Sequence, residues 1–210
     1  ITMRIKGIEG QQIAALVGNQ CDAESIFALK QLMETLGSPN LDCRQDGAAI
    51  DPSLRAGYLF NTTIAGIEEA DVCLLIGSNP RCEAPLINAR IRKRWLTGEL
   101  SVAQIGPKIN LTYTVDTLGT GPQTLQEIVD GTHSFTKTLR KANRPMLVLG
   151  QGAISRPDGA AILSVAHRIA EEFDLIREDW NGFNMLHTSA ARVGALDLGF
   201  VPAEDGLDTA

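Results

Sequence analysis

The sequence predicts an α/β fold with a doubly wound, mostly parallel sheet and helices on both of its faces. The first observation is a pair of unbroken apolar runs, at residues 72–76 and 146–149. A short run without polar alternation is typical of a strand that is covered on both faces, as in parallel sheets. The second observation is that such runs alternate with segments of helical periodicity. This alternation favours right-handed strand–helix–strand crossovers.

A strand, a glycine-containing turn and a helix follow one another between residues 70 and 95. The turn after the apolar run consists of Gly77, Ser78, Asn79 and Pro80. Glu83 and Pro85 are expected in the first turn of the helix, because Glu complements the positive end of the helix dipole and Pro has no N–H to leave unpaired. Units of this kind place ligands at the carboxyl edge of open α/β sheets.

This helix is predicted to bury one stripe and to carry a group of cations. The buried stripe consists of Ile87, Ile91 and Trp95. The cations are Arg90, Arg92, Lys93 and Arg94. The helix dipole accounts for only part of so many cations, so they are candidates for a contact surface. The alternative is that they pair within the domain, with Glu68, Glu69 or Asp71.

The rest of the chain continues the alternation. Further strands are predicted at residues 13–17, 40–44, 101–105 and 113–115. Further helices are predicted at residues 22–36, 124–130, 134–142 and 157–173, the first with Asp22 as N-cap and Gly37 as C-cap. Residues 45–65 lack a sustained period and predict a long loop. Residues 1–178 are expected to form one α/β domain, and residues 179–210 a glycine-rich tail that starts a further segment.

Glycines follow four of the predicted strands, and they are Gly18, Gly77, Gly106 and Gly150. In a parallel sheet these turns would gather at one edge, where ligands of such folds bind. The structural interpretation is that strand-to-helix turns need glycine in any case. Neither the G-x-G-x-x-G pattern nor a phosphate loop is present at Gly77, and Gly150-Gln151-Gly152 is followed by no glycine until Gly159.

The composition excludes several classes of function. Of the 210 residues, 44% are apolar and 21% charged, as in an ordinary globular chain. The net charge of −6 and the aromatic content of 5% argue against nucleic-acid binding. No apolar run reaches the ~18 residues that span a bilayer, so no direct membrane insertion is expected. The start lacks an initiator Met and a signal-peptide pattern, and the chain is expected to be a piece of a longer protein.

Metal-binding and catalytic groupings are not expected. The cysteines are far apart, at Cys21, Cys43, Cys73 and Cys82, which excludes a locally spaced zinc or iron–sulfur site and predicts four free thiols in a reducing compartment. No Ser/His/Asp or Cys/His grouping has a spacing that indicates a catalytic site. The carboxylates that lie close together in the sequence are interpreted as turn-formers and solvated acids; they are Asp42, Asp46 and Asp51.

Four stretches carry a resemblance to a known family: residues 40–47 (NLDCRQDG), 61–68 (NTTIAGIE), 77–95 (GSNPRCEAPLINARIRKRW) and 180–184 (WNGFN). The chain resembles the C-terminal part of the large iron–sulfur subunit of respiratory complex I. This is the G subunit of the bacterial NADH–quinone oxidoreductase, or the 75 kDa subunit in mitochondria. The similarity extends over essentially the whole chain, and the sequence most resembles alphaproteobacterial members of this family.

The resemblance implies a Rossmann-like domain of the molybdopterin oxidoreductase type, akin to formate dehydrogenases. In such relatives a Gly-x-Asn-Pro turn contacts the pterin guanine dinucleotide, and Gly77, Ser78, Asn79 and Pro80 match it as a vestigial site. The complex I branch is expected to hold no cofactor here. The resemblance places the 2Fe-2S and 4Fe-4S clusters of the full subunit in an N-terminal part that precedes this chain.

The function implied by the resemblance is that of a structural and docking domain, which supports electron transfer from NADH to quinone by the whole complex. Implied partners are the other subunits of the peripheral arm, including the flavin- and NADH-binding subunit. The implied location is peripheral, at the cytoplasmic side of the bacterial inner membrane, or the matrix side in mitochondria. The alternatives are an active molybdopterin-binding oxidoreductase domain and a generic nucleotide-binding module.

Overall fold

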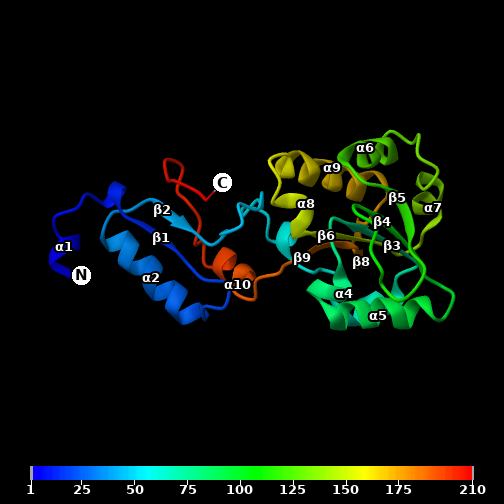
Figure 1. Cartoon of the computed structure of the whole chain (residues 1–210), viewed down its shortest axis with the longest axis horizontal. Helices are drawn as coiled ribbons and strands as arrows, with labels where there is room; N and C mark the ends of the chain where they lie inside the picture. Colours follow the sequence, from blue (N-terminus) through cyan, green and yellow to red (C-terminus); the bar gives the residue numbers. More distant parts are fainter. Residues whose placement is uncertain (1, 210) are drawn as a thin grey trace. The chain divides into compact units, whose positions relative to one another are not determined.

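The computed structural model describes residues 2–209, which fold into two compact units (Figure 1). The larger unit comprises Ala49–Asp51 and Ala56–Thr188. The smaller unit comprises the residues up to Ala48, Pro52–Arg55 and the residues from Ser189 onward. Each unit contains a parallel sheet of its own.

The larger unit is built on a sheet whose five described strands are all parallel. In spatial order they are β5 (Asp116–Gly119), β4 (Ser101–Ile105), β3 (Val72–Ile76), β6 (Pro145–Gly150) and β9 (Phe183–Leu186). Every residue of β3 and β6 is buried, in agreement with the two unbroken apolar runs. The chain adds strands from β3 toward one edge and then crosses to β6 on the other side of β3. The strand order therefore reverses between β3 and β6, which is where open α/β sheets bind ligands.

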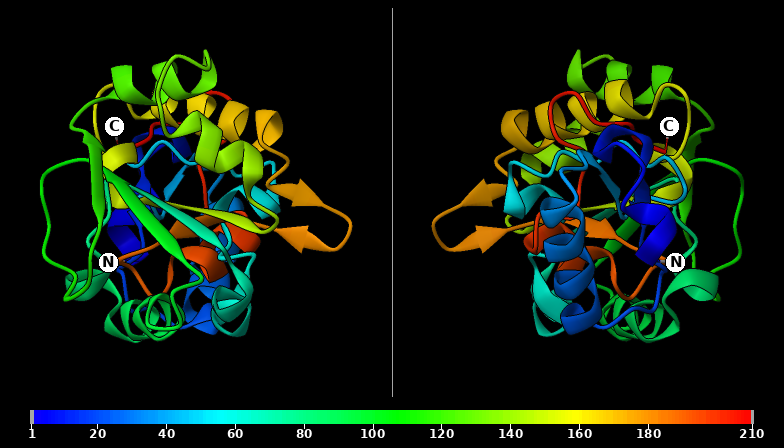
Figure 2. Two further views of the ribbon diagram at one scale, coloured as in Figure 1. Left: turned by 90° about the vertical axis from the view of Figure 1, so that its right-hand side faces the viewer. Right: turned by 90° about the vertical axis from the view of Figure 1, so that its left-hand side faces the viewer.

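Helices cover both faces of this sheet (Figure 2). Helix α5 (Pro85–Trp95) lies on one face, and α6 (Pro122–Val129) and α9 (Gly159–Glu172) lie on the other. The shorter elements are η2 (Arg55–Tyr58), α3 (Thr63–Gly66), η3 (Ile67–Glu69), α4 (Pro80–Glu83), α7 (Thr136–Lys141), α8 (Gln151–Ile154) and the antiparallel pair β7 (Ile176–Arg177) and β8 (Trp180–Asn181). Of the helices described between residues 2 and 209, none is both long and apolar enough to cross a membrane.

The core below α5 shows why this helix is held in one orientation. Cys73 of β3 pairs in register with Val102 of β4 and Met146 of β6. All three side chains are buried in one cluster with Ile91 of α5, whose exposed fraction is 0%. Burying a side chain of this size contributes about 1.5–3 kcal/mol. The inner stripe of α5 is therefore anchored to the sheet, as the spacing of its apolar residues predicts.

The smaller unit contains β1 (Ala14–Leu16) and β2 (Asn40–Asp42), which pair in parallel. Helix α2 (Ala23–Thr35) connects the two strands. The Asp22 carboxylate accepts a hydrogen bond from the Ser25 N–H at 2.7 Å, and Gly37 has a φ of +68° after the last turn. Both ends of α2 are thus capped as predicted. The remaining elements of this unit are α1 (Thr2–Ile5), η1 (Gly10–Gln12) and α10 (Arg192–Asp197).

Two expectations about strands are wrong. Gly18 follows β1 of the smaller unit and so does not share a sheet edge with Gly77, Gly106 and Gly150. The strand expected at residues 113–115 lies instead at Asp116–Gly119. Tyr113 and Val115 lie in a loop, and their side chains pack against the core below α5. This packing explains the apolar residues that the sequence has there. The true edge strand begins with exposed residues and carries no apolar signal.

The region after residue 178 contains more regular structure than a glycine-rich tail. Strand β9, at Phe183–Leu186, is buried in the sheet next to β6, and α10 follows it in the smaller unit. The sequence of β9 has a polar Asn184 in its middle, which hides the strand from a hydropathy pattern. The Asn184 side chain is buried and bonds the Leu147 carbonyl and the Thr62 hydroxyl. A domain boundary between residues 178 and 179 stays a prediction.

Candidate functional site

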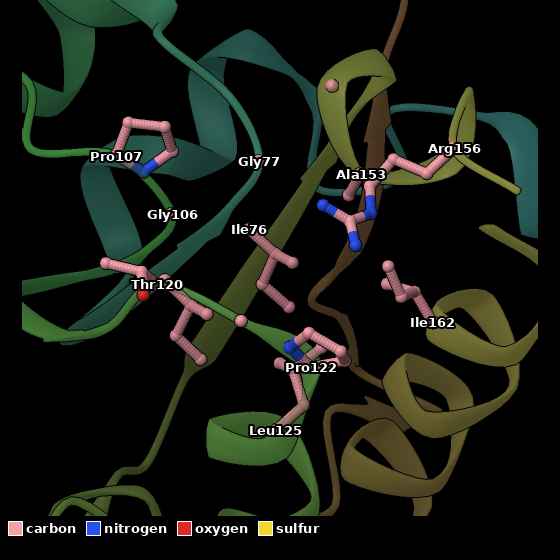
Figure 3. Close-up of a pocket in the computed structure, with 13 residues that line it drawn as sticks. Ile76, Gly77, Gly106, Pro107, Thr120, Pro122, Leu125, Ala153, Arg156 and Ile162 are labelled. Atoms are coloured by element: carbon pink, nitrogen blue, oxygen red, sulfur yellow. The ribbon is translucent and has the colours of Figure 1, made fainter. Parts of the chain in front are cut away.

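A crevice opens at the carboxyl edge of the larger sheet, next to the position where the strand order reverses (Figure 3). The turns that follow β3, β4, β5 and β6 supply its walls, and α6 and α9 close it from one side. The lining residues are Ile76, Gly77, Ile105, Gly106, Pro107, Thr120, Gly121, Pro122, Leu125, Gly152, Ala153, Arg156 and Ile162. The volume of the crevice is about 70 Å³. Typical small-molecule sites measure roughly 300–1,000 Å³, so this space is small.

The turn after β3 packs directly on the turn after β6. Gly77 has a φ of +57°, and a Cβ at this position would lie 2.6 Å from the backbone nitrogen and the Cβ of Ala153. A Cβ at Gly150 would lie 2.5 Å from the Cβ of Ser78, and one at Gly152 would lie 2.8 Å from the Gly77 carbonyl oxygen. The glycines are therefore needed for close contact between two pieces of backbone. The contact leaves no space for a ligand between the two turns at these positions.

A carboxylate of the same chain takes the polar groups of the Gly77–Pro80 turn. Glu83 Oε1 accepts a hydrogen bond from the Asn79 N–H at 2.9 Å, and Glu83 Oε2 accepts one from the Ser78 hydroxyl at 3.0 Å. Pro80, the first residue of α4, has no N–H to offer. A bound phosphate would have to displace the Glu83 carboxylate to reach these donors.

Among the described lining residues, Arg156 is the one with a charged side chain. In Figure 3 it reaches from the turn after α8 toward the middle of the crevice. Its guanidinium group binds both carboxylate oxygens of Asp158, at 2.6 and 2.9 Å. Hydrogen bonding to Arg156 lowers the pKa of the Asp158 carboxyl group. The positive charge that could attract an anionic ligand is thus already paired.

These observations decide whether a pterin guanine dinucleotide fits. The crevice is too small, the two turns are in contact, and the donors of the Gly77–Pro80 turn are bonded to Glu83. The described residues in this arrangement therefore do not fit the dinucleotide. The four residues of the predicted vestigial site do lie together at the expected edge of the sheet. That they are the remnant of a ligand site stays a prediction.

The cations of α5 are mostly engaged within the larger unit. Arg90 and Lys93 both bind Glu68, the latter at 2.7 Å, and together they lower the pKa of the Glu68 carboxyl group. Arg94 binds Glu99 and donates to the Ala70 carbonyl at 2.9 Å. Within residues 2–209, Arg92 is exposed and has no ion pair or side-chain hydrogen bond.

Residues that could hold a metal ion are scattered. In the part of the chain that the structure describes, no three His, Cys, Asp or Glu side chains come together as a metal site requires. The cysteines of the described part are free, as predicted, and burial raises the pKa of Cys43 to about 11 and of Cys73 to about 12. Asp42 is not a solvated acid, because its side chain is 1% exposed and binds Arg44 at 2.9 Å.

Sequence reasoning misses the contacts that close the crevice. Ala153 and Arg156 are remote from Gly77 in the sequence, and no local pattern identifies their contact with this edge. The sequence predicts Glu83 at the start of a helix, but not its bonds to Ser78 and Asn79. The signal that could have found one of them is the Glu at the end of the first turn after the N-cap residue Asn79, which resembles a capping box with one additional residue.

Comparison with known proteins places this sequence in a family. A family model described as molybdopterin oxidoreductase matches residues 2–210. The G subunit of the NADH-quinone oxidoreductase of Rickettsia felis is 46% identical over 200 residues, which cover 95% of this chain and 30% of that protein. The proteins of the same name from Rickettsia conorii and Rickettsia bellii are 46% identical over 197 residues and 42% identical over 200 residues, which cover 94% and 95% of this chain and 29% of each relative. This chain spans about 30% of the length of these relatives. It belongs to the molybdopterin oxidoreductase family, and within that family it is similar to the G subunits of NADH-quinone oxidoreductases.

Proposed function

We propose that the chain is part of the G subunit of an NADH-quinone oxidoreductase and serves there as a structural and docking domain without a redox centre of its own. The support for the assembly is the identity of 42–46% to proteins of that name. Electron transfer from NADH to quinone is then an activity of the whole complex. The iron–sulfur clusters of the full subunit lie outside this chain in the proposal.

The proposal extends to partners and location. The domain contacts other subunits of the peripheral arm, among them the subunit that binds flavin and NADH, and it lies at the cytoplasmic side of the inner membrane. The support is again the similarity to the rickettsial proteins, whose name as a subunit implies an assembly of several chains.

One observation carries the structural role: the turn at Gly77 is closed by the protein itself. Ala153 fills the space beside Gly77, and Glu83 takes the polar donors that a phosphate group would use. Contacts of this kind stabilise the edge of a sheet. They offer no room or charge for a dinucleotide.

A specific observation favours the alternative, an active pterin- or nucleotide-binding domain. The buried Oδ1 of Asn79 and the buried Oε1 of Gln151 accept no hydrogen bond within the described residues, and both follow strands at the same sheet edge. Buried acceptors without a donor are uncommon, and a ligand could supply one. The two proposals differ in what happens to catalysis when the crevice changes.

The test uses the full-length subunit in its complex and separates the amount of complex from its turnover. Gly77→Ala strains the closed turn, so we expect less assembled complex but an unchanged NADH:quinone turnover per complex. Arg156→Glu reverses the charge at the crevice, and we expect normal amounts and normal turnover. A loss of turnover of about tenfold or more in normally assembled Arg156→Glu complex would contradict the proposal and favour the alternative.

A further inference from the structure

Helix α5 has a second ordered stripe, on the side opposite to its buried one. The inner stripe faces the sheet through Ile91, which is fully buried. The outer stripe follows the spacing i, i+3, i+7 and i+10 and consists of Leu86, Ala89 and Lys93 of the helix and of Leu96, the C-cap residue that directly follows it. The exposed fractions of Leu86 and Leu96 are 78% and 59%. Single exposed leucines are ordinary, but two at the ends of a regular stripe mark a surface that another helix can cover.

The spacing of this outer stripe is that of the a and d positions of a coiled coil. With Leu86 at position a, Ala89 and Leu96 occupy d positions and Lys93 the second a position. Arg90 and Arg92 then fall at the e and g positions on the two flanks. From Leu86 to Leu96 the stripe is about 15 Å long, at about 1.5 Å per residue. Its four a and d positions offer four layers of knobs and holes to a partner helix, three of them formed by apolar residues.

The charge of the outer face decides the chemistry of that partner. Arg90 and Lys93 share the single carboxylate of Glu68. Arg92 has no ion pair within residues 2–209. Positive charge is therefore in excess on this face, although the chain has a net charge of −6. A partner that covers the face needs carboxylates beside an apolar stripe.

We propose that the outer face of α5 docks an acidic amphipathic helix of a neighbouring subunit of the complex. Its apolar stripe packs on Leu86, Ala89 and Leu96. Its flanking Glu and Asp side chains pair with Arg92 and with the excess charge of Arg90 and Lys93. This proposal rests on the proposed docking function and names the surface that performs it. A second copy of the chain, or a helix from elsewhere in the same polypeptide, is an outcome that the test distinguishes.

The first experiment places a photo-crosslinking residue, p-benzoylphenylalanine, at Leu86 or Leu96 of the full-length subunit and irradiates the purified complex. Mass spectrometry of the cross-linked peptides should identify a neighbouring subunit, with a peptide rich in Glu and Asp. The control site is Ile176, which has a similar exposed fraction of 54% but lies on the β7–β8 pair. Cross-links only within the same polypeptide, only to a second copy, or none at all would overturn the proposal.

The second experiment reverses charge in the full-length subunit. Arg92→Glu with Lys93→Glu should weaken its incorporation into the complex by about tenfold, with a stronger dependence on salt, as expected for the loss of charged hot-spot contacts. The melting temperature of the unassembled subunit should change little, because the ion pair of Lys93 with Glu68 is exposed to solvent and Arg90 stays bound to the same carboxylate. The control changes the charge equally on α7, with Lys137→Glu and Lys141→Glu, and should assemble normally.

The outcomes separate this inference from the proposed function. Normal assembly of the α5 variant, together with reduced assembly of Gly77→Ala, rejects docking through α5 and leaves the structural role standing. Normal assembly of both variants rejects both. Equal defects in the α5 and α7 variants would show a general charge effect and would overturn the assignment of the surface.

Discussion

Adding a side chain at Gly77 would cost free energy for two independent reasons, so a substitution there is the sharpest test of the closed turn. Its φ of +57° lies in the left-handed region, which costs a residue with a side chain about 1–2 kcal/mol. An added Cβ would also lie 2.6 Å from atoms of Ala153, and overpacking of this kind costs about 1–3 kcal/mol. We therefore expect Gly77→Ala to lower the free energy of unfolding of the larger unit by about 2–5 kcal/mol.

Gly98 provides a matched control in the same unit. Its φ is +80°, but a Cβ there would meet no heavy atom within 4 Å. Gly98→Ala should therefore cost only the conformational penalty of about 1–2 kcal/mol. The difference between the two variants isolates the contact between the turns after β3 and β6.

The assay is unfolding in urea, followed by tryptophan fluorescence. Both tryptophans of the chain, Trp95 and Trp180, lie in the larger unit, so the signal reports this unit. Equal losses of unfolding free energy for Gly77→Ala and Gly98→Ala would refute the reasoning, because the Ala153 contact would then carry no energy.

Three further predictions concern buried or capping groups. Asp42→Ala should destabilise the smaller unit by about 3–5 kcal/mol, because it leaves the partly buried Arg44 without its carboxylate, and faster amide exchange in β1 and β2 would report it. Burial lowers the pKa of His167 despite the nearby carboxylates of Glu171 and Asp51, so the unfolded state binds the proton more readily and the larger unit should lose stability as the pH falls below about 6.5. His167→Gln should remove this slope from a series of urea titrations; an unchanged slope would contradict the assignment. Glu83→Ala removes the acceptor of two hydrogen bonds and should cost about 1–3 kcal/mol by the fluorescence assay, and Glu83→Gln, which keeps one acceptor oxygen, should cost less.

The central strands and the capped helix could be predicted because their signals are local. Val72–Ile76 has the bounds that its apolar run indicates, since a strand between two neighbours and two helix layers is apolar throughout. Helix α2 begins after Asp22 and ends before Gly37 for reasons contained in its own termini. Strand β5 could not be predicted, because an edge strand needs few apolar residues. The partly buried loop residues Tyr113 and Val115 gave an apolar pattern that wrongly predicted a strand just before it.

The candidate site could be predicted only in part, for the same physical reason. The turn at Gly77 lies at the carboxyl edge of the sheet because a parallel strand leads to it. Whether this turn is open depends on Ala153, whose distance from Gly77 along the chain gives no local signal. The division of the chain into two units likewise follows from contacts that bring residues from 189 onward back to β1 and β2. Sequence periodicity describes one element at a time and does not report such contacts.

The measurement that tests the central claim most directly is the cofactor content of the full-length subunit purified in its complex. Elemental analysis gives molybdenum and tungsten, and mass spectrometry of a denaturing extract gives any pterin or guanine dinucleotide. The iron content of the same sample serves as the control for retained cofactors. The closed turn at Gly77 predicts iron without molybdenum, tungsten or pterin. A stoichiometric amount of a pterin dinucleotide or of either metal would contradict the structural role.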